Sequence, residues 1–347
     1  MQLFHLKYVD WLDSQLIYHS QPRVGVEGIN ILAPSSPYVC IGYHQNMEQE
    51  VDLAYCKENN IPVFRREVGG GAVFLDGDQV FFQIVLHKDN PLVQGGKSDL
   101  YRRMLEPVAK TYQDLGIPAI YRPVNDVVTT EGRKISGTGA AEIADHIIIV
   151  GNLIADFNYE VMTRVLRVPD EKFRDKVFKS MTENLTTIKR ETGSMPTWDE
   201  MADPLIHNFE QALGKLTPAE LPQKVRDQAE KLKTEFLSAV WLFSEKKGRK
   251  TTATKIATGV NIVQKVFKAP GGLLKAVYEL KDDRIFDLSL SGDFFCYPRE
   301  AVSDLEVALE GAKLADLRQL IETFYQDNIV ESPGVTPSDW NTLLGES

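Results

Sequence analysis

Cysteine is scarce in this chain, which contains only Cys40, Cys56 and Cys296. Three unevenly spaced cysteines cannot form a disulfide framework, and they lack the paired spacing of a structural zinc site. The sequence therefore excludes a small disulfide-rich secreted protein. It predicts a protein of the reducing cytoplasm.

Long hydrophobic runs are also missing. The apolar runs, such as residues 147–150, fall far short of the ~20 residues that a membrane-spanning helix needs. Residues 1–15 contain acidic side chains and no apolar core typical of a secretory signal. We therefore expect neither membrane insertion nor secretion.

Positive charge is the third deficit. Lys and Arg number 39 against 49 Asp and Glu, which gives a formal net charge of −10. A chain of that charge is a poor overall match to a phosphate backbone, so a dedicated nucleic-acid binder is disfavoured. A local basic cluster remains compatible with this average, and we expect one in a ligand groove made by Arg65, Arg66, Arg133 and Lys134.

The 347 residues are enough for about two domains at ~150 residues each. A predicted helical stretch over residues 218–243 is followed by a polar basic run without an apolar anchor at residues 244–255. Beyond it we predict a small α+β unit with strands over 256–269, 271–281 and 284–290 and helices near 299–309 and 314–325. The predicted organisation is a large unit at 1–243, a linker at 244–255 and a small domain at 256–347.

The larger unit interleaves strand and helix patterns. Strands are predicted over Tyr38–Ile41 and residues 61–65, 125–130 and 147–156, and helices over 48–59 and 99–115. Residues 72–75 and 80–86 predict a hairpin about the turn at residues 76–78. Because short turns join several strands, we predict an α+β fold with a mixed, largely antiparallel sheet flanked by helices.

Three consecutive glycines, Gly69, Gly70 and Gly71, follow Arg65 and Arg66 and precede an apolar strand. Without Cβ atoms, backbone can approach a ligand closely and present N–H donors to anionic oxygens. The arginines can add charge for a phosphate or carboxylate. The glycines alone could form a flexible turn, but the arginines before them and the apolar strand after them favour a ligand-binding loop. It is neither a Walker A loop nor a dinucleotide fingerprint, because no GK[ST] and no helix follow.

A second informative stretch runs from Asn125 to Ala141. Lys134 lies there in a predicted glycine-flanked turn beside small hydroxyl residues, where its ammonium could meet a phosphate or a developing oxyanion. Asp126 could hold a divalent cation that bridges phosphates. The alternative interpretation is that Lys134 is an exposed turn lysine and Asp126 a turn aspartate, neither of which binds a ligand.

Taken together, these stretches resemble the lipoate–protein ligases of the biotin/lipoate ligase superfamily. The resemblance rests on RREVGGGAVFLD at 65–76, IGYHQN at 41–46, NDV with GRKISGTGAA within 125–141, and RVPDEKFRDKVFKSMTENLTTI at 167–188. The last segment is similar to the family segment that folds over the adenylate. GGLLKAVYELKDDRIFDLSLSGDFF, after residue 256, resembles the family's C-terminal accessory domain. The resemblance implies a catalytic domain of the class II synthetase and biotin ligase type.

The implied activity has two steps. Lipoate and MgATP give lipoyl-adenylate and pyrophosphate, and the lipoyl group then moves to a lysine of a carrier domain. The implied carriers are lipoyl domains of the 2-oxoacid dehydrogenase E2 type or the glycine cleavage H protein type. The acceptor lysine attacks the mixed anhydride directly, so no enzyme nucleophile is required. No nucleic-acid or membrane partner is implied.

The resemblance also implies roles for individual residues. The nucleotide would be contacted by Arg66, Gly71, Ala72, Val73 and Phe74. Lys134 would be the catalytic residue and would touch both the phosphate and the lipoyl carbonyl. Gly69 and Gly70 would shape the lipoyl tunnel, and Asp126 would be the metal candidate.

The sequence departs from the family pattern at several positions. Leu75 and Val150 stand where the family often has histidine, and the order Asp76-Gly77-Asp78-Gln79 departs from the GN that commonly follows the aspartate. The basic run at 244–255 replaces the family's usual connection. The glycine loop and Lys134 are unaffected, so these changes bear on acyl-chain and carrier preference.

Three alternatives remain open. An octanoyl or lipoyl transferase of the same superfamily would work through a cysteine thioester and needs a well-placed thiolate. Cys40 and Cys56 lie near the first motif, although an apolar strand around Cys40 favours a core position. A non-catalytic lipoyl-binding module and a biotin ligase are the other two.

Overall fold

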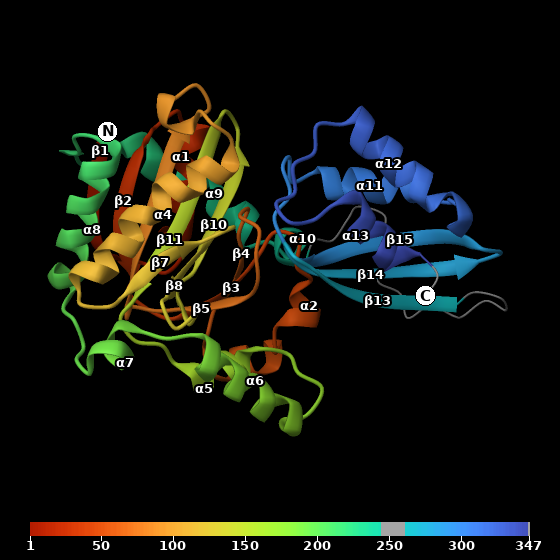
Figure 1. Cartoon of the computed structure of the whole chain (residues 1–347), viewed down its shortest axis with the longest axis horizontal. Helices are drawn as coiled ribbons and strands as arrows, with labels where there is room; N and C mark the ends of the chain where they lie inside the picture. The colour runs from red at the N-terminus through yellow and green to blue at the C-terminus, as the bar shows by residue number, and fades with distance from the viewer. Residues whose placement is uncertain (244–260, 346–347) are drawn as a thin grey trace.

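The computed structural model describes residues 1–243 and 261–345, which form two lobes that meet along one side (Figure 1). The predicted linker at 244–255 and the predicted strand residues 256–260 lie outside the described residues. The boundaries of the three-part division therefore stay a prediction.

A six-stranded mixed sheet forms the centre of the larger lobe. Its strand order is β10 (Thr138–Ile143), β11 (His146–Ile154), β6 (Gln79–His87), β2 (Gly28–Pro34), β1 (Gln2–Val9) and β12 (Thr217–Pro218). Neighbours from β10 to β2 are antiparallel, whereas β1 is parallel to both β2 and β12. Helices flank the sheet, so the predicted α+β class with a mixed, largely antiparallel sheet is confirmed (Figure 1).

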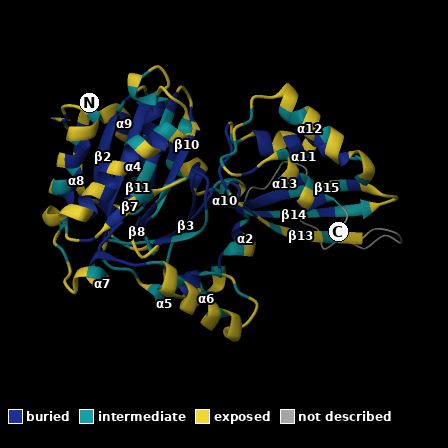
Figure 2. Ribbon diagram, viewed as in Figure 1, coloured by how far each residue is buried: buried dark blue, intermediate teal, exposed yellow. Residues whose placement is uncertain are grey.

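The two faces of this sheet differ in chemistry because side chains alternate along each strand. One face is apolar: Ile29 pairs with Ile84, and Ile31 with Phe82. These side chains share a hydrophobic core with α4 (Lys97–Asp114) and α8 (Trp198–Leu213). Figure 2 shows the strands as the most deeply buried part of this lobe.

The opposite face is polar at its centre. Asn30 pairs with Gln83, and both side chains are buried. Asn30 Nδ2 donates to Gln21 Oε1 at 2.7 Å, and Gln83 Nε2 donates to the Ser14 carbonyl at 2.6 Å. These bonds hold α1 (Asp13–Arg23) on the polar face, where α9 (Gln223–Phe236) packs against α1.

The predicted hairpin about residues 76–78 is wrong. β5 (Val73–Leu75) pairs with β3 (Tyr38–Ile41) and belongs to a separate three-stranded sheet completed by β4 (Val63–Arg65). β6, the strand after the turn, enters the large sheet instead. The turn residues reverse the chain as expected, but tertiary pairing sends its two arms into different sheets.

The predicted turn around Lys134 is also wrong, because Lys134 begins strand β9 (Lys134–Ser136). β9 joins β8 (Asp126–Thr129) and β7 (Ala119–Arg122) in an antiparallel sheet. Lys134 also forms an isolated parallel bridge to Leu185. Strand pairing on two sides therefore fixes the backbone that carries this lysine.

Two predicted helices are each divided. Residues 48–59 form α2 (Met47–Glu50) and α3 (Leu53–Glu58), because Val51 leaves the helical path to bridge Leu166 and Asp52 caps a new start. The stretch 218–243 divides into α9 and α10 (Ala239–Phe243). The remaining helical segments of this lobe are η1 (Pro91–Val93), α5 (Tyr159–Val165), α6 (Glu171–Asn184) and α7 (Ile188–Thr192).

The smaller lobe is an antiparallel meander of β13 (Asn261–Ala269), β14 (Gly272–Lys281) and β15 (Arg284–Asp293). Alternate residues of β14 are buried against helices. The helical segments are α11 (Ala301–Leu309), η2 (Leu314–Asp316), α12 (Leu317–Asp327) and α13 (Pro337–Leu344), of which α13 was not predicted. No helix in the described ranges has the length and apolar character to cross a bilayer.

The end of β15 and the residues after it join the lobes. Gly292 N donates to the His44 carbonyl at 3.0 Å, and Gly70 N donates to the Phe294 carbonyl at 3.2 Å. The rings of His44 and Phe294 stack with centroids 4.8 Å apart. Burial, with Arg65 and Arg299 nearby, lowers the pKa of His44 to about 3, so the stacked ring is neutral.

A buried carboxylate, Glu67, makes a polar link between the lobes. Arg23 of α1 grips it with two hydrogen bonds of 2.9 and 2.8 Å, and Arg299 of the smaller lobe pairs with it as well. Burial alone would raise the pKa of Glu67. The arginines and His19 outweigh that effect and lower it from 4.5 to about 2.

We predict that Glu67→Gln lowers the free energy of unfolding at pH 7 by about 3–5 kcal/mol, because two arginines lose their buried counter-ion. In the native chain, the carboxylate stabilises the fold above pH 4.5, and this contribution is lost as the pH falls towards 2. Denaturant unfolding between pH 7 and 3 should therefore show a flatter pH profile for the variant.

The matched control is Glu322→Gln, which breaks an exposed pair with Arg318 at 3.0 Å and should change stability by less than about 1 kcal/mol. Equal effects of the two substitutions would contradict the role of Glu67.

Candidate functional site

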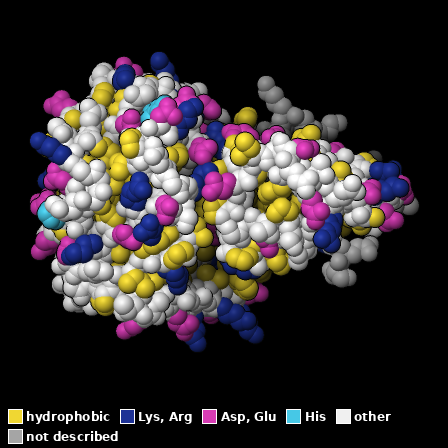
Figure 3. All heavy atoms as spheres, turned by 45° about the horizontal axis from the view of Figure 1, so that its top comes forward, with side chains coloured by type: hydrophobic (Ala, Val, Ile, Leu, Met, Phe, Trp, Pro, Cys, Tyr) yellow, Lys and Arg dark blue, Asp and Glu magenta, His cyan; other side chains and the backbone are white. Residues whose placement is uncertain are grey.

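A cavity of about 450 Å³ lies between the two lobes. Figure 3 shows a furrow where the lobes meet, with hydrophobic side chains along it. The larger lobe contributes the glycine loop, α1, β6, β11 and the start of β9. The smaller lobe contributes the turn between β13 and β14 together with Asp293 and Phe295.

The glycine loop forms one side of the cavity and is held by Arg66. The Arg66 guanidinium donates to the carbonyls of Gly69 at 2.8 Å, Gly71 at 2.9 Å and Cys40 at 3.2 Å. Gly70 has a φ of +95°, a conformation that other residues rarely adopt. Arg66 therefore braces a backbone shape that depends on glycine.

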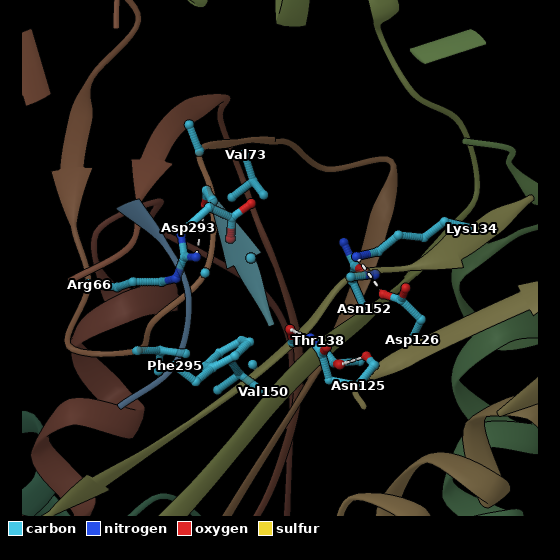
Figure 4. Close-up of a pocket in the computed structure, with 18 of the residues that line it drawn as sticks. Arg66, Val73, Asn125, Asp126, Lys134, Thr138, Val150, Asn152, Asp293 and Phe295 are labelled. Atoms are coloured by element: carbon cyan, nitrogen blue, oxygen red, sulfur yellow. Dashed lines mark hydrogen bonds and ion pairs between the residues drawn. The ribbon is translucent and has the colours of Figure 1, made fainter. Parts of the chain in front are cut away.

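Asp293 of the smaller lobe lies directly against this loop (Figure 4). A Cβ on Gly71 would come within 2.9 Å of Asp293 Oδ2, and one on Gly70 within 3.1 Å of Arg66 Nη2. The Phe295 ring is the next neighbour of Gly70, at 3.4 Å. A side chain at Gly71 would therefore displace the Asp293 carboxylate, and one at Gly70 would press on the Arg66 guanidinium.

Lys134 and Asp126 lie at the opposite side of the cavity (Figure 4). Lys134 Nζ is 2.8 Å from Asp126 Oδ1, and Arg122 Nη2 is 2.9 Å from Asp126 Oδ2. Burial alone would raise the pKa of Asp126, but Lys134 and Arg122 outweigh it and lower the pKa. Asp126 is therefore an ionised counter-ion that holds the lysine at the cavity.

The walls between these two sides are mostly apolar, and they include the two departures from the expected family pattern. Leu75 and Val150 both line the cavity, together with Val68, Val73, Phe81 and Phe295. A second buried part of the lining is polar and consists of Gln15, Tyr18 and Gln83. The cavity therefore has two charged sides, an apolar wall and a buried polar patch.

The structure brings together most of the residues that the sequence suggested. The cavity lining includes Arg66, Gly70, Gly71, Ala72, Val73, Asp126 and Lys134. Gly69 and Phe74 are outside this lining. Gly69 faces the Phe294 carbonyl, and Phe74 is buried in a hydrophobic cluster of the larger lobe.

Arg65 and Arg133, which we expected in the ligand groove, do not line the cavity. Arg65 is buried and donates to the carbonyls of Tyr43 at 2.7 Å and Gln45 at 2.6 Å, as well as to that of Leu242. Arg133 pairs with Glu131 and Glu191. The neighbours Arg65 and Arg66 point to different sides of the strand end, so only Arg66 reaches the cavity.

Sequence reasoning missed the residues that the smaller lobe and α1 contribute. Asp293 and Phe295 lie more than 200 positions from the glycine loop, and no spacing in the sequence relates them to it. Gln15 and Tyr18 lie one turn apart on a helix that was not predicted. The sequence contains one signal for them: on a helical reading of residues 13–23, Gln15 is a polar residue on the face that would be buried.

The segment 167–188, expected to cover an adenylate, ends beside Lys134. Thr186 N donates to the Lys134 carbonyl at 2.8 Å. A second, more open hollow of about 630 Å³ lies between this segment and Lys134 and contains Arg122 and Lys176. Lys134 therefore borders both the main cavity and a basic hollow under α6.

None of the three cysteines lines the main cavity, and all three are buried in the described part of the chain. Burial raises the pKa of Cys40 and Cys296, and it raises that of Cys56 to about 11. The thiols are therefore protonated at neutral pH, and the structure offers no thiolate at the site.

Comparisons with known proteins identify the family of this chain. A family model described as "Lipoyl protein ligase A/B catalytic domain" matches residues 12–210. The lipoate-protein ligase A subunit 1 of Thermoplasma acidophilum is 32% identical over 184 residues, covering 50% of this chain and 68% of that protein. Lipoate–protein ligase 2 of Staphylococcus aureus is 26% identical, covering 85% and 87%. The octanoyltransferase LipM of Kyrpidia tusciae is 25% identical, covering 66% and 91%.

Solved structures show the same fold. The bipartite lipoate protein ligase of Thermoplasma acidophilum, described with its E2 lipoyl domain, has a TM-score of 0.62 at 27% identity and covers 70% of this chain and 95% of its own. A lipoate-protein ligase A bound with ATP has a TM-score of 0.58 at 24% identity, covering 70% and 98%. LipL1 of P. falciparum, in complex with lipoate, has a TM-score of 0.68 at 16% identity and covers 95% of both chains.

We predict that Gly70→Ala and Gly116→Ala both lower the unfolding free energy by about 1–2 kcal/mol, because both glycines have a positive φ. Only Gly70→Ala should also weaken lipoate binding, since its methyl group meets Arg66 at the cavity whereas Gly116 has open space around it. Calorimetric titration with lipoate, after thermal unfolding has been measured for each variant, tests this. Equal lipoate affinities in the two variants would show that the loop serves only as a turn.

Proposed function

Because the chain belongs to the lipoyl protein ligase A/B catalytic-domain family, we propose that it activates lipoate with ATP and transfers the lipoyl group to a carrier lysine. The observation that carries this proposal is that Lys134 and the Arg66-braced glycine loop open onto one cavity. Both are groups that an anionic nucleotide and a carboxylate require.

The proposed chemistry has two displacements. A carboxylate oxygen of lipoate attacks the α-phosphorus of ATP, and pyrophosphate leaves. The amino group of the carrier lysine then attacks the carbonyl carbon of the lipoyl-adenylate, loses a proton, and AMP leaves. Both steps develop negative charge on oxygens between the reactants, so a fixed cation at that point lowers both barriers.

Lys134 is the proposed catalytic residue because it is the cation at that point. Its ammonium is already positioned by Asp126 at 2.8 Å and by strand pairing on both sides of its backbone. An incoming phosphate would compete with Asp126 for the same ammonium. The pair keeps the lysine side chain oriented before the substrates arrive.

The nucleotide is assigned to Arg66 and to the segment Gly71, Ala72, Val73 and Phe74. Since the Phe74 side chain is buried in a hydrophobic cluster, its contribution would come from its backbone. Lipoate is assigned to the apolar part of the cavity beside Gly70. Gly69 would shape this path indirectly, because it packs against the Phe294 carbonyl.

Mg²⁺ would enter with the phosphates of ATP. The described ranges contain no cluster of three or more His, Cys, Asp or Glu residues that could hold a metal by itself. Mg²⁺ commonly needs only one or two carboxylates when substrate phosphates supply further oxygens. Asp126 is the proposed carboxylate, and it would have to give up part of its contact with Lys134.

The proposed partner is a carrier domain of the E2 lipoyl type or the glycine cleavage H protein type. A similar ligase is described with an E2 lipoyl domain, which supports this choice. We also propose a catalytic domain at 1–243, a linker at 244–255 and an accessory domain at 256–347, acting in the cytoplasm.

A transferase that works through a cysteine thioester is the second candidate, supported by the similarity to LipM octanoyltransferases. The positions of the cysteines argue against it, because each is buried and outside the cavity. A lipoyl-binding module without catalysis would bind lipoate but release no pyrophosphate.

We predict that Lys134→Ala reduces lipoate-dependent exchange between pyrophosphate and ATP by a factor of about 10²–10³, because the transition-state charge loses its fixed cation. Lys110→Ala is the matched control: that lysine also pairs with an aspartate, Asp114, but lies on the exposed side of α4. It should retain full exchange. Full activity of Lys134→Ala would remove the basis of the proposed mechanism.

We further predict that the double variant Cys40→Ala, Cys56→Ala retains ATP-dependent lipoyl transfer within about threefold, as far as its lower stability allows. The measurement is mass spectrometry of a carrier domain after incubation with lipoate and ATP. The transferase would be favoured instead if the chain transferred the acyl group from an acyl-carrier thioester without ATP and lost this activity when either thiol was removed.

A further inference from the structure

One buried part of the cavity lining is polar, although the neighbouring wall is apolar. Gln15, Tyr18 and Gln83 form this part and are 4%, 1% and 2% exposed, respectively. They belong to α1 and β6 of the larger lobe, so an acyl chain that extends from Lys134 into this lobe towards α1 and β6 reaches them. The groups that meet the far end of the chain are therefore two amides and a phenol.

These polar groups are held rigidly by one another and by their neighbours. Tyr18 Oη donates to Gln15 Oε1 at 2.8 Å, and Gln15 Nε2 donates to Tyr38 Oη at 2.6 Å. Gln83 Nε2 donates to the Ser14 carbonyl at 2.6 Å, and its Oε1 accepts from Asn30. Asn30 Oδ1, just behind, has no hydrogen-bond partner in the described part of the chain.

The network still has capacity towards the cavity. Each glutamine amide nitrogen carries two hydrogens and has one hydrogen-bond partner among the described residues, and the Tyr18 oxygen can also accept. A terminal methyl group placed here would displace water from these groups without offering them a hydrogen-bond partner. A sulfur-containing ring is polarizable and accepts weak hydrogen bonds, so it restores part of what the water supplied.

We propose, on the basis of the proposed function, that Gln15, Tyr18 and Gln83 select the far end of the acyl chain. They favour the dithiolane of a lipoyl group over the methyl end of an octanoyl group. The three residues are thus specificity-determining, whereas the glycine loop and Lys134 serve the carboxylate and nucleotide that both acids share.

The test compares Tyr18→Phe with Tyr38→Phe. Both substitutions remove one buried hydroxyl from the same network, but only Tyr18 lines the cavity. We expect Tyr18→Phe to raise the ratio of kcat/KM for octanoate to that for lipoate by about threefold to tenfold in pyrophosphate exchange. Tyr38→Phe should leave the ratio unchanged. An unchanged ratio in Tyr18→Phe, or the same change in both variants, would overturn the proposal.

Calorimetric binding of lipoate and octanoate to the unmodified chain gives a second test that needs neither turnover nor a stable variant. Lipoate should bind about tenfold more tightly than octanoate, and equal or reversed affinities would overturn the proposal. If binding discriminates but no acid supports pyrophosphate exchange, the ligase function fails while the selection of the chain end stands. If exchange proceeds equally well with both acids, the ligase function stands and the selection fails.

Discussion

One buried negative charge, the carboxylate of Glu67, organises the region on which the site depends. An unpaired carboxylate in a protein interior is prohibitively costly, so its arginine partners must be present for this fold to exist. Those partners come from helix α1 and from the smaller lobe, while Glu67 itself lies two residues before the first glycine of the loop. The ion pairs that compensate this charge therefore hold α1, the smaller lobe and the segment before the glycine loop together at Glu67.

The composition of the candidate site follows from that arrangement. Once the lobes are joined, the smaller lobe supplies Asp293 and Phe295 to the cavity, and the larger lobe supplies the braced loop and Lys134. The two lobes therefore share one ligand site. Within the larger lobe, Lys134 pairs with Asp126 and Arg66 donates to carbonyls of the glycine loop, so both cations are held in position before any ligand binds.

The sequence predicted the motifs more reliably than their surroundings. Arg66, the glycines and Lys134 were suggested by their residue types and were assigned to the site through the resemblance to the ligase family. Arg65 could not be separated from Arg66, since adjacent residues of a strand end point to different sides and only the fold decides which side is the cavity. The turn at 76–78 was recognised, but turn residues specify a reversal and not the strands that pair afterwards. Asp293 and Phe295 could not be foreseen, because nothing local links them to a loop that tertiary packing brings near.

Strand β6 shows a further connection between binding and folding. Its odd-numbered residues Phe81 and Gln83 line the cavity, while Phe82 and Ile84 lie in the hydrophobic core. A pairing slip of one residue would exchange these two sets, which would bury glutamine among aliphatic side chains and turn phenylalanine towards the ligand. A misregistered sheet would thus be unstable as well as inactive. The alternation that shapes the cavity therefore also constrains folding, because a chain with this strand out of register would be less stable and more open to degradation.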